Sequence, residues 1–362
     1  MTKKKFTIPV STLIGSSYSN FKKAVARHRI DKKYRKKYLL SNAISRILDV
    51  FGSIEKIGYK NTIDNFQITE SPVFIIGFWR SGTTLLHNLL CQNPHFGFVN
   101  TFQAVFPNHC LMHQWWLKRL AQMLMPERRP VDNVKLDFKF PQEEEIALGN
   151  IQLLSFYYFW YFPNEFDEFV NKNLLFKNTT DEELQNWQKV YINLIKTALI
   201  NTGGRRFISK NPPNSFRIKY ILKMFPQAKF ICIHRNPYHV ISSFIRFAHP
   251  VMEEISFQNY DKKDLNIRLI RLYKLFLSKF KKDKNLIPKG NLIEVKYEDL
   301  ISDELSVIKN IYEILNLEGF DRALPQMEKF LKEGGEFNSG NYLPDEETLQ
   351  IIKDELGGLI SD

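Results

Sequence analysis

The fold of this chain is decided by one stretch of sequence, Pro72-Val-Phe-Ile-Ile-Gly77-Phe78-Trp79-Arg80-Ser81-Gly82-Thr83-Thr84. A short apolar run breaks into a polar loop bounded by glycines and then into an apolar helical pattern. The stretch therefore predicts a strand, a phosphate-binding loop and a helix. Its spacing matches the P-loop template G-x-x-x-x-G-K-[ST], except that Thr83 stands where the nucleotide-binding lysine belongs. Backbone N–H groups and a helix N-terminus can still hold an anionic phosphate, and Arg80 is the replacement cation.

Strand and helix patterns alternate along the rest of the chain. Strands are predicted at 96–99, 207–209, 229–233 and 291–295. Helical patterns cover 17–50, 103–125, 181–200, 262–284, 302–315 and 321–332, and another helix begins near 141 and runs into the aromatic segment 156–162. This alternation is typical of a P-loop NTPase-like α/β fold, a doubly wound parallel sheet flanked by many helices. We expect an N-terminal helical extension at residues 1–70, packed on a single domain at 71–362.

The balance of charge favours an anionic ligand or surface. The 362 residues carry a formal charge of +12, although such an excess is often a solvated basic face. The segment 17–50 interleaves apolar residues with many lysines and arginines. It is either a helix that contacts a membrane surface or a helical cap on the domain. We expect no nucleic-acid partner.

The cysteines point to a reducing compartment. Cys91, Cys110 and Cys232 lie in or beside apolar runs and lack metal-ligand spacing, which predicts buried thiols. No stretch reaches the roughly eighteen uninterrupted apolar residues that a membrane-spanning helix needs. We therefore expect a cytoplasmic protein that is soluble or peripheral.

Three predicted strands end in polar turns that carry a cation. These turns contain Arg80, Lys210 and Arg235. In a parallel sheet the three turns meet at one edge, and a proline soon after each of the last two suits the first turn of a helix. Together they predict a site for a ligand with more than one anionic group.

A lysine-free G-x-x-x-x-G-T-T loop joined to a later R-N-P-x-x-x-x-x-S resembles the sulfotransferases that use 3′-phosphoadenosine-5′-phosphosulfate (PAPS). Arg235 and Ser243 are eight positions apart, as the 3′-phosphate motif of that family requires. The Arg-Ser-Gly-Thr-Thr element is similar to the branch that contains tyrosylprotein sulfotransferases and many bacterial enzymes. Three further elements resemble the bacterial group, namely Lys210-Asn211-Pro212, Pro141-x-Glu-Glu-Glu-x-Ala-Leu and Tyr297-Glu298-Asp299-Leu300.

The resemblance implies a donor and a set of binding roles. PAPS would be the co-substrate and 3′-phosphoadenosine-5′-phosphate the product, with no metal ion required. Arg235 and Ser243 would hold the 3′-phosphate, since arginine offers a bidentate fork. Arg80 and Lys210 would stabilise the sulfuryl group in transfer. The residues implied to hold the 5′-phosphosulfate, through backbone N–H groups and threonine hydroxyls, are Arg80, Ser81, Gly82, Thr83 and Thr84.

A base must take the proton of the acceptor hydroxyl. The candidates are Glu143, Glu144, Glu145, His109 and His113. On a helix Glu144 lies above Leu148, Ile151 and Ser155, an apolar stripe that would bury its carboxylate, and burial raises the pKa of such a group. Glu143 is the second choice. Alternatively, the three acids only complement the helix dipole. For His109 and His113 we expect a packing role and not a metal pair.

The acceptor would be a small apolar molecule with a hydroxyl, such as a sterol, lipid or phenol. The aromatic run 156–162 either walls its pocket or packs in the core, and the Gly-rich segment 333–342 would close over the donor. A P-loop kinase or NTPase is the alternative enzyme, but it requires a lysine in place of Thr83. A non-catalytic basic module that binds membrane or nucleic acid is the alternative from another class.

Overall fold

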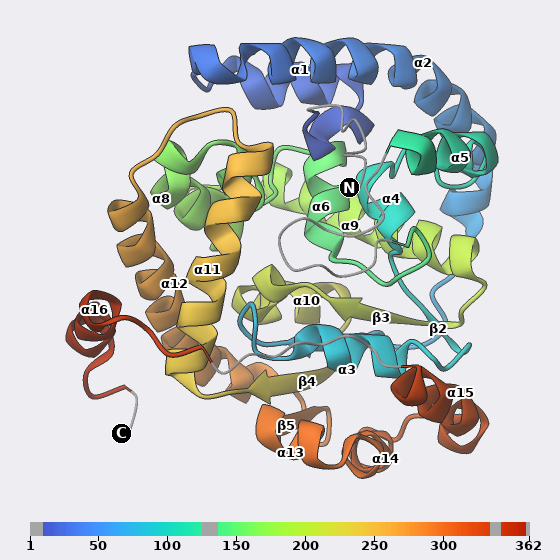
Figure 1. The fold of residues 1–362 in the computed structure, drawn as a ribbon. Helices are drawn as coiled ribbons and strands as arrows, with labels where there is room; N and C mark the ends of the chain where they lie inside the picture. The colour runs from blue at the N-terminus through green and yellow to red at the C-terminus, as the bar shows by residue number, and fades with distance from the viewer. Residues whose placement is uncertain (1–9, 125–136, 334–341, 360–362) are drawn as a thin grey trace, which may run out of the picture. The chain divides into compact units, whose positions relative to one another are not determined.

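The computed structural model describes residues 10–124, 137–333 and 342–359 (Figure 1). These residues form two compact units. The described residues of unit 1 fall within Met1–Gln67, Val99–Asn201 and His249–Tyr260. Those of unit 2 fall within Ile68–Phe98, Thr202–Ala248 and Asp261–Asp362.

Unit 2 contains a five-stranded sheet in the order β2-β3-β1-β4-β5, and every neighbouring pair is parallel. The strands are β1 (Val73–Ile76), β2 (Phe96–Gly97), β3 (Arg206–Lys210), β4 (Lys229–His234) and β5 (Leu292–Lys296). All four residues of β1, the central strand, are buried. An uninterrupted apolar strand is expected where helices cover both faces of a parallel sheet.

Helices cover both faces of this sheet, as the alternation predicted (Figure 1). On one face Val73 and Ile75 pack with the apolar side of α3 and with α14 and α15. On the other face Phe74 packs against the rings of Phe225 and Phe230. The helices of unit 2 are α3 (Thr83–Leu90), η5 (Pro212–Phe216), α10 (Ile218–Met224), α11 (Pro237–Ile255, which continues into unit 1), α12 (Lys262–Asp283), η6 (Lys284–Leu286), α13 (Tyr297–Ser302), α14 (Glu304–Ile314), α15 (Phe320–Lys332) and α16 (Glu346–Leu356).

Unit 1 is built mainly from helices around an aromatic core. The segment 156–162 is buried there throughout, as the core interpretation of it predicts. The helices are η1 (Thr12–Gly15), α1 (Tyr18–Ala26), η2 (Lys32–Tyr34), α2 (Arg35–Asn65), α4 (Thr101–Val105), α5 (Gln114–Leu124), α6 (Glu144–Ile151), α7 (Tyr158–Tyr161), η3 (Pro163–Glu165), α8 (Phe166–Phe169), η4 (Val170–Leu174) and α9 (Asp181–Thr202).

Three predicted helices have different bounds. The helix expected at 17–50 is interrupted between α1 and α2, and α2 continues to Asn65. The helix expected at 103–125 is also interrupted, because Pro107 cannot donate an N–H to a helix, so α4 ends at Val105 and α5 begins at Gln114. The helix after Pro141 ends at Ile151 and does not reach the aromatic segment.

The cysteines are free in the described residues. Cys110 and Cys232 are buried and Cys91 is half-buried. Burial raises the pKa of the Cys110 and Cys232 thiols well above the usual range. Within the described ranges, none of the helices combines the length and apolarity needed to cross a bilayer.

The central strand should carry much of the stability of unit 2. Phe74→Ala removes a ring with no exposed surface, so we expect it to lower the free energy of unfolding by about 3–5 kcal/mol. Ile301 is 46% exposed, so Ile301→Ala should lower it by less than about 1 kcal/mol. Urea denaturation followed by circular dichroism measures both. Equal losses for the two variants would contradict the buried position of β1.

Candidate active site

The turn between β1 and α3 has an unusual backbone. Gly77, Arg80 and Gly82 have φ angles of 151°, 68° and 98°. A Cβ atom on Gly82 would lie 2.3 Å from a ring carbon of Tyr297, so only glycine fits there. Arg80 holds a left-handed conformation that disfavours a side chain by about 1–2 kcal/mol, and such residues cluster at functional sites.

Hydroxyl groups fix both ends of this turn. The N–H of Gly77 donates to the Ser215 hydroxyl over 2.9 Å, and that hydroxyl donates back to the Gly77 carbonyl over 3.0 Å. The Ser81 hydroxyl donates to the Phe78 carbonyl over 2.7 Å. Within α3 the Thr83 side chain is buried, whereas Thr84 is exposed. The turn is therefore held by hydrogen bonds within unit 2.

Arg235 joins this turn to the end of β5. Its guanidinium lies 4.3 Å from the centre of the Tyr297 ring, and its Nη1 donates to the Arg80 carbonyl over 3.2 Å. Because β4 and β5 are paired in register with His234 opposite Lys296, the residues that follow each strand are neighbours. Arg235 is 9% exposed, so its charge sits where water is largely excluded.

Arg80 extends along α11. Its Nε donates to the Ser243 hydroxyl over 3.1 Å, and its guanidinium lies 5.2 Å from the centre of the Phe247 ring. The two residues implied to bind opposite ends of the donor are therefore in direct contact. The structure brings Arg80, Ser243 and Arg235 into one hydrogen-bonded group at the C-terminal edge of the sheet, as the predicted meeting of the turns required.

Lys210 ends β3 at the same edge, since its neighbour across the pair is Ile75 of β1. The side chain is buried. His87 of α3 is also buried, and burial together with the Lys210 charge holds the pKa of His87 well below its usual range. The imidazole is therefore neutral at pH 7. His87 could not be predicted as a site residue from the sequence, because a lone histidine on an apolar helix face carries no local pattern.

The three acids at the start of α6, Glu143 at its N-cap and Glu144 and Glu145 in its first turn, lie in unit 1. Glu144 and Glu145 have no exposed surface, so the predicted burial of Glu144 is confirmed. The Phe156 N–H donates to Glu145 over 2.6 Å, and Glu143 accepts a short hydrogen bond from the Tyr157 hydroxyl. Glu145 thus has a structural role. The predicted stripe was wrong in one member, because the helix ends before Ser155.

The two candidate histidines hold α2 in place. His109 Nε2 lies 2.9 Å from the Leu48 carbonyl, and His113 Nε2 lies 3.0 Å from the Phe51 carbonyl. This favours the packing role over a base or a metal pair. In the described segments no group of three or more histidine, cysteine, aspartate or glutamate side chains could hold a metal ion.

The Gly-rich segment expected to cover the donor lies mostly outside the described residues, since 334–341 are not part of them. Its last residue, Tyr342, is described and contacts α11. The Arg246 guanidinium lies 4.2 Å from the centre of its ring, and His239 Nδ1 lies 3.2 Å from its carbonyl. Tyr342 therefore contacts α11 at His239 and Arg246, which precede and follow Ser243 in the sequence.

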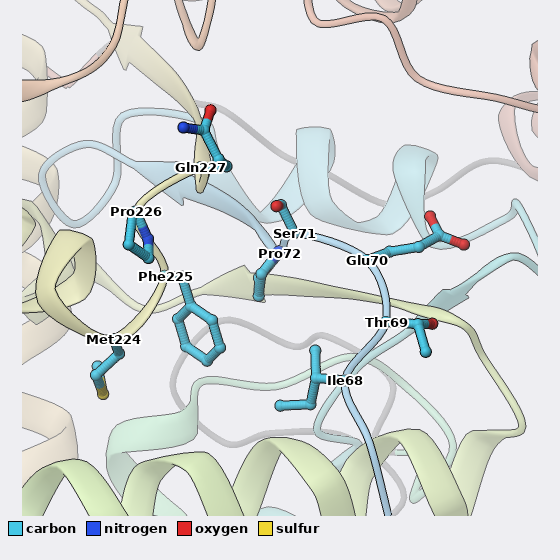
Figure 2. Close-up of a pocket in the computed structure, with 9 residues that line it drawn as sticks. All are labelled: Ile68, Thr69, Glu70, Ser71, Pro72, Met224, Phe225, Pro226 and Gln227. Carbon is cyan, nitrogen blue, oxygen red and sulfur yellow. The ribbon is translucent and has the colours of Figure 1, made fainter.

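A hollow of about 270 Å³ lies at the N-terminal ends of the strands, opposite to the turns that carry Arg80, Lys210 and Arg235 (Figure 2). It is lined by residues 68–72, which precede β1, and by residues 224–227, which precede β4. Glu70 there binds His95 and Arg206, over 2.9 and 2.8 Å. Ligands of parallel α/β sheets bind at the carboxyl ends of the strands, so this hollow is not the candidate active site.

The fold and the site define an α/β protein with a P-loop-like turn that lacks the lysine of nucleotide triphosphatases. A sulfotransferase family profile matches residues 72–322, and the chain belongs to that family. The protein is accordingly a sulfotransferase enzyme. The match includes Arg80, Lys210, Arg235 and Ser243.

Several known proteins are similar over nearly the whole chain. The omega-hydroxy-beta-dihydromenaquinone-9 sulfotransferase Stf3 of Mycobacterium bovis is 27% identical over 352 residues, which cover 96% of this chain and 89% of that protein. The crystal structure of sulfotransferase STF1 from Mycobacterium tuberculosis has a TM-score of 0.65 at 16% identity and covers 95% of this chain and 94% of its own. For STF9 from Mycobacterium avium the TM-score is 0.63 at 16% identity, with 96% and 97% covered. The two solved structures show the shared fold.

Gly82→Ala should distort the phosphate loop, because its new methyl group meets the Tyr297 ring. Gly290 is the matched control, since it also has a positive φ of 86° but no atom within 4 Å of an added Cβ. We expect Gly290→Ala to lower the free energy of unfolding by about 1 kcal/mol and to leave sulfuryl transfer unchanged. Gly82→Ala should lower kcat/KM by about tenfold or more in addition. Equal activity of the two variants would contradict the steric role of Tyr297.

Proposed function

We propose that this sulfotransferase transfers a sulfuryl group from PAPS to the hydroxyl of a small apolar acceptor and releases 3′-phosphoadenosine-5′-phosphate. The observation that supports the donor is the contact of Arg80 with both Ser243 and Arg235 beside the phosphate loop. Such a group offers two arginines to a ligand with separated anionic ends. The proposal requires no metal ion.

The phosphate loop and Arg235 divide the donor between them in this proposal. Backbone N–H groups of residues 80–84 bind the 5′-phosphosulfate at the N-terminus of α3. Arg235 and Ser243 bind the 3′-phosphate through charge-assisted hydrogen bonds. Lys210 and Arg80 stabilise the oxygens of the sulfuryl group, a contact that typically contributes a few kcal/mol where water is excluded.

The chemical step is an in-line displacement. The acceptor oxygen forms a bond to sulfur while the bond from sulfur to the 5′-phosphate oxygen breaks, and the departing phosphate keeps the electron pair. The acceptor proton passes to a carboxylate. We propose Glu144 for this role because it is fully buried and matches the bacterial motif. Glu143 is the second candidate.

The proposed acceptor class is an apolar molecule with a hydroxyl, such as a lipid, sterol or phenol. The mycobacterial relative is named for an omega-hydroxylated dihydromenaquinone, a molecule of this kind. Its 27% identity over almost the whole chain supports the class of acceptor. A panel of hydroxylated quinones, sterols and phenols tests the choice.

The proposed location is the cytoplasm. Cys91, Cys110 and Cys232 are free thiols. Free thiols persist in a reducing compartment. Isolation of the protein from cells with these cysteine thiols oxidised would contradict this location.

Arg235→Ala should weaken binding of 3′-phosphoadenosine-5′-phosphate by about 10–100-fold, because a bidentate charge-assisted contact is lost. Isothermal titration calorimetry measures this affinity. Arg271 is exposed and pairs with Glu355 on the surface, so Arg271→Ala is the control and should bind normally. Unchanged binding by Arg235→Ala would refute the donor assignment. Magnesium-dependent ATP hydrolysis by the wild type would favour the kinase alternative.

Glu144→Gln should lower kcat by about 10²–10⁴-fold and leave the affinity for 3′-phosphoadenosine-5′-phosphate within about twofold, because only the base is lost. Glu145→Gln is the matched control, since that carboxylate accepts the Phe156 N–H. The main effect of Glu145→Gln should be a lower melting temperature, and its loss of kcat should be smaller than that of Glu144→Gln. A Glu144→Gln enzyme with normal turnover would assign the base elsewhere, and Glu143→Gln would then be measured.

A further inference from the structure

Helix α2 buries several charged, polar or small residues and exposes several large apolar ones. Its buried positions include Lys37, Ser41, Ser45, Gly52 and Glu55, which are charged, polar or small. Among its exposed positions are five large apolar residues, with exposed fractions of 50% to 79%. These residues, called here the outer face of α2, are Leu39, Ile47, Val50, Ile54 and Ile57.

Hydrogen bonds fix the rotation of α2 about its axis. Ser41 Oγ accepts the Ser11 N–H over 2.9 Å, and Ser45 Oγ donates to the Ser16 carbonyl over 2.9 Å. Glu55 accepts three successive backbone N–H groups, from residues 111–113, over 2.8 to 3.1 Å. Turning the apolar residues inward would break these bonds and leave buried polar groups unsatisfied. The outer face therefore stays exposed to solvent in unit 1.

The segment that Glu55 holds also exposes apolar side chains beside α2. Met112 is 37% exposed and Trp115 is 68% exposed. Their position beside α2 is fixed by Phe51, whose ring packs edge-on against the Trp116 ring at 5.2 Å. An exposed tryptophan next to an apolar helix face is typical of the boundary between membrane and water.

The charges around the outer face are almost all positive. Between Lys32 and Asn65 seven exposed lysines or arginines accompany one exposed carboxylate, Asp64. Arg46, Lys56 and Lys60 are among these cations, interspersed with the outer-face residues in sequence. Each such cation contributes about 1 kcal/mol of attraction to an anionic bilayer surface. A second copy of the chain would bring the same charges together, and protein interfaces are depleted in lysine.

We propose that the outer face of α2, with Met112 and Trp115, binds the surface of a bilayer that contains anionic lipids. The helix lies in the interface with its apolar side chains among the acyl chains and its cations at the headgroups. This contact places the enzyme at a membrane, where an apolar acceptor of the proposed class dissolves. The proposed membrane contact involves residues of unit 1 alone and does not depend on the donor assignment.

Co-sedimentation of the full chain with vesicles tests the proposal. We expect binding to phosphatidylcholine vesicles that contain phosphatidylglycerol, and weaker binding without it. The double variant Ile47→Glu/Ile54→Glu should reduce the bound fraction by about tenfold or more. The matched control is Ile301→Glu/Ile314→Glu, which changes two isoleucines that are 46% and 47% exposed in unit 2 and should bind as the wild type does.

Quenching of tryptophan emission by brominated lipid gives a second readout, and Trp115→Phe should lose most of it. Normal vesicle binding by Ile47→Glu/Ile54→Glu, or equal binding to neutral vesicles, would overturn the proposal. Light scattering after gel filtration separates the remaining alternative. A wild-type dimer that this double variant makes monomeric, without vesicle binding, would assign the outer face to a second copy. Titration with 3′-phosphoadenosine-5′-phosphate checks that each variant keeps its donor site.

Discussion

The contact between the Arg235 guanidinium and the Tyr297 ring is the interaction on which the phosphate-binding edge depends. The ring fills the space above Gly82, and the guanidinium reaches from the ring to the Arg80 carbonyl. One cation thus joins the residues that follow β1, β4 and β5. A cation over an aromatic face contributes more when desolvated, about 2 kcal/mol. These contacts hold the residues of the edge together within unit 2.

Much of the fold could be predicted from the sequence because its determinants are local. The run Val73–Ile76 has no polar residue to place on a solvated face, and this favours a parallel sheet covered on both sides. Gly77 and Gly82 mark the bounds of the loop after β1 in the sequence. The bounds of α2 and α4 could not be read in this way, because tertiary contacts extend the first helix and Pro107 interrupts the second pattern.

The residues of the candidate site also differ in whether they could be predicted from the sequence. Arg80 and Arg235 were predicted because they follow strands, and Ser243 because its spacing from Arg235 matches the 3′-phosphate motif of the sulfotransferases that the sequence resembles. Ser215, His87 and Tyr297 gain their roles from partners distant in sequence, and Ser215 lies 138 residues from Gly77. The helical pattern ranked Glu144 first and Glu143 second as the base, but it did not predict the partner of Glu145. The hydrogen bond from the Phe156 N–H separates Glu145 from the other two.

The buried side of α2 has a consequence for how this enzyme changes through evolution. Ser41, Ser45 and Glu55 hold the helix through backbone atoms of the chain around it. Ile47 and Ile57 are exposed and take part in none of these hydrogen bonds. Substitutions at these positions can therefore accumulate without disturbing unit 1. The catalytic edge lies in other parts of the sequence. Under the proposed membrane contact, substitutions on this helix surface would change membrane binding without changing the residues proposed for sulfuryl transfer.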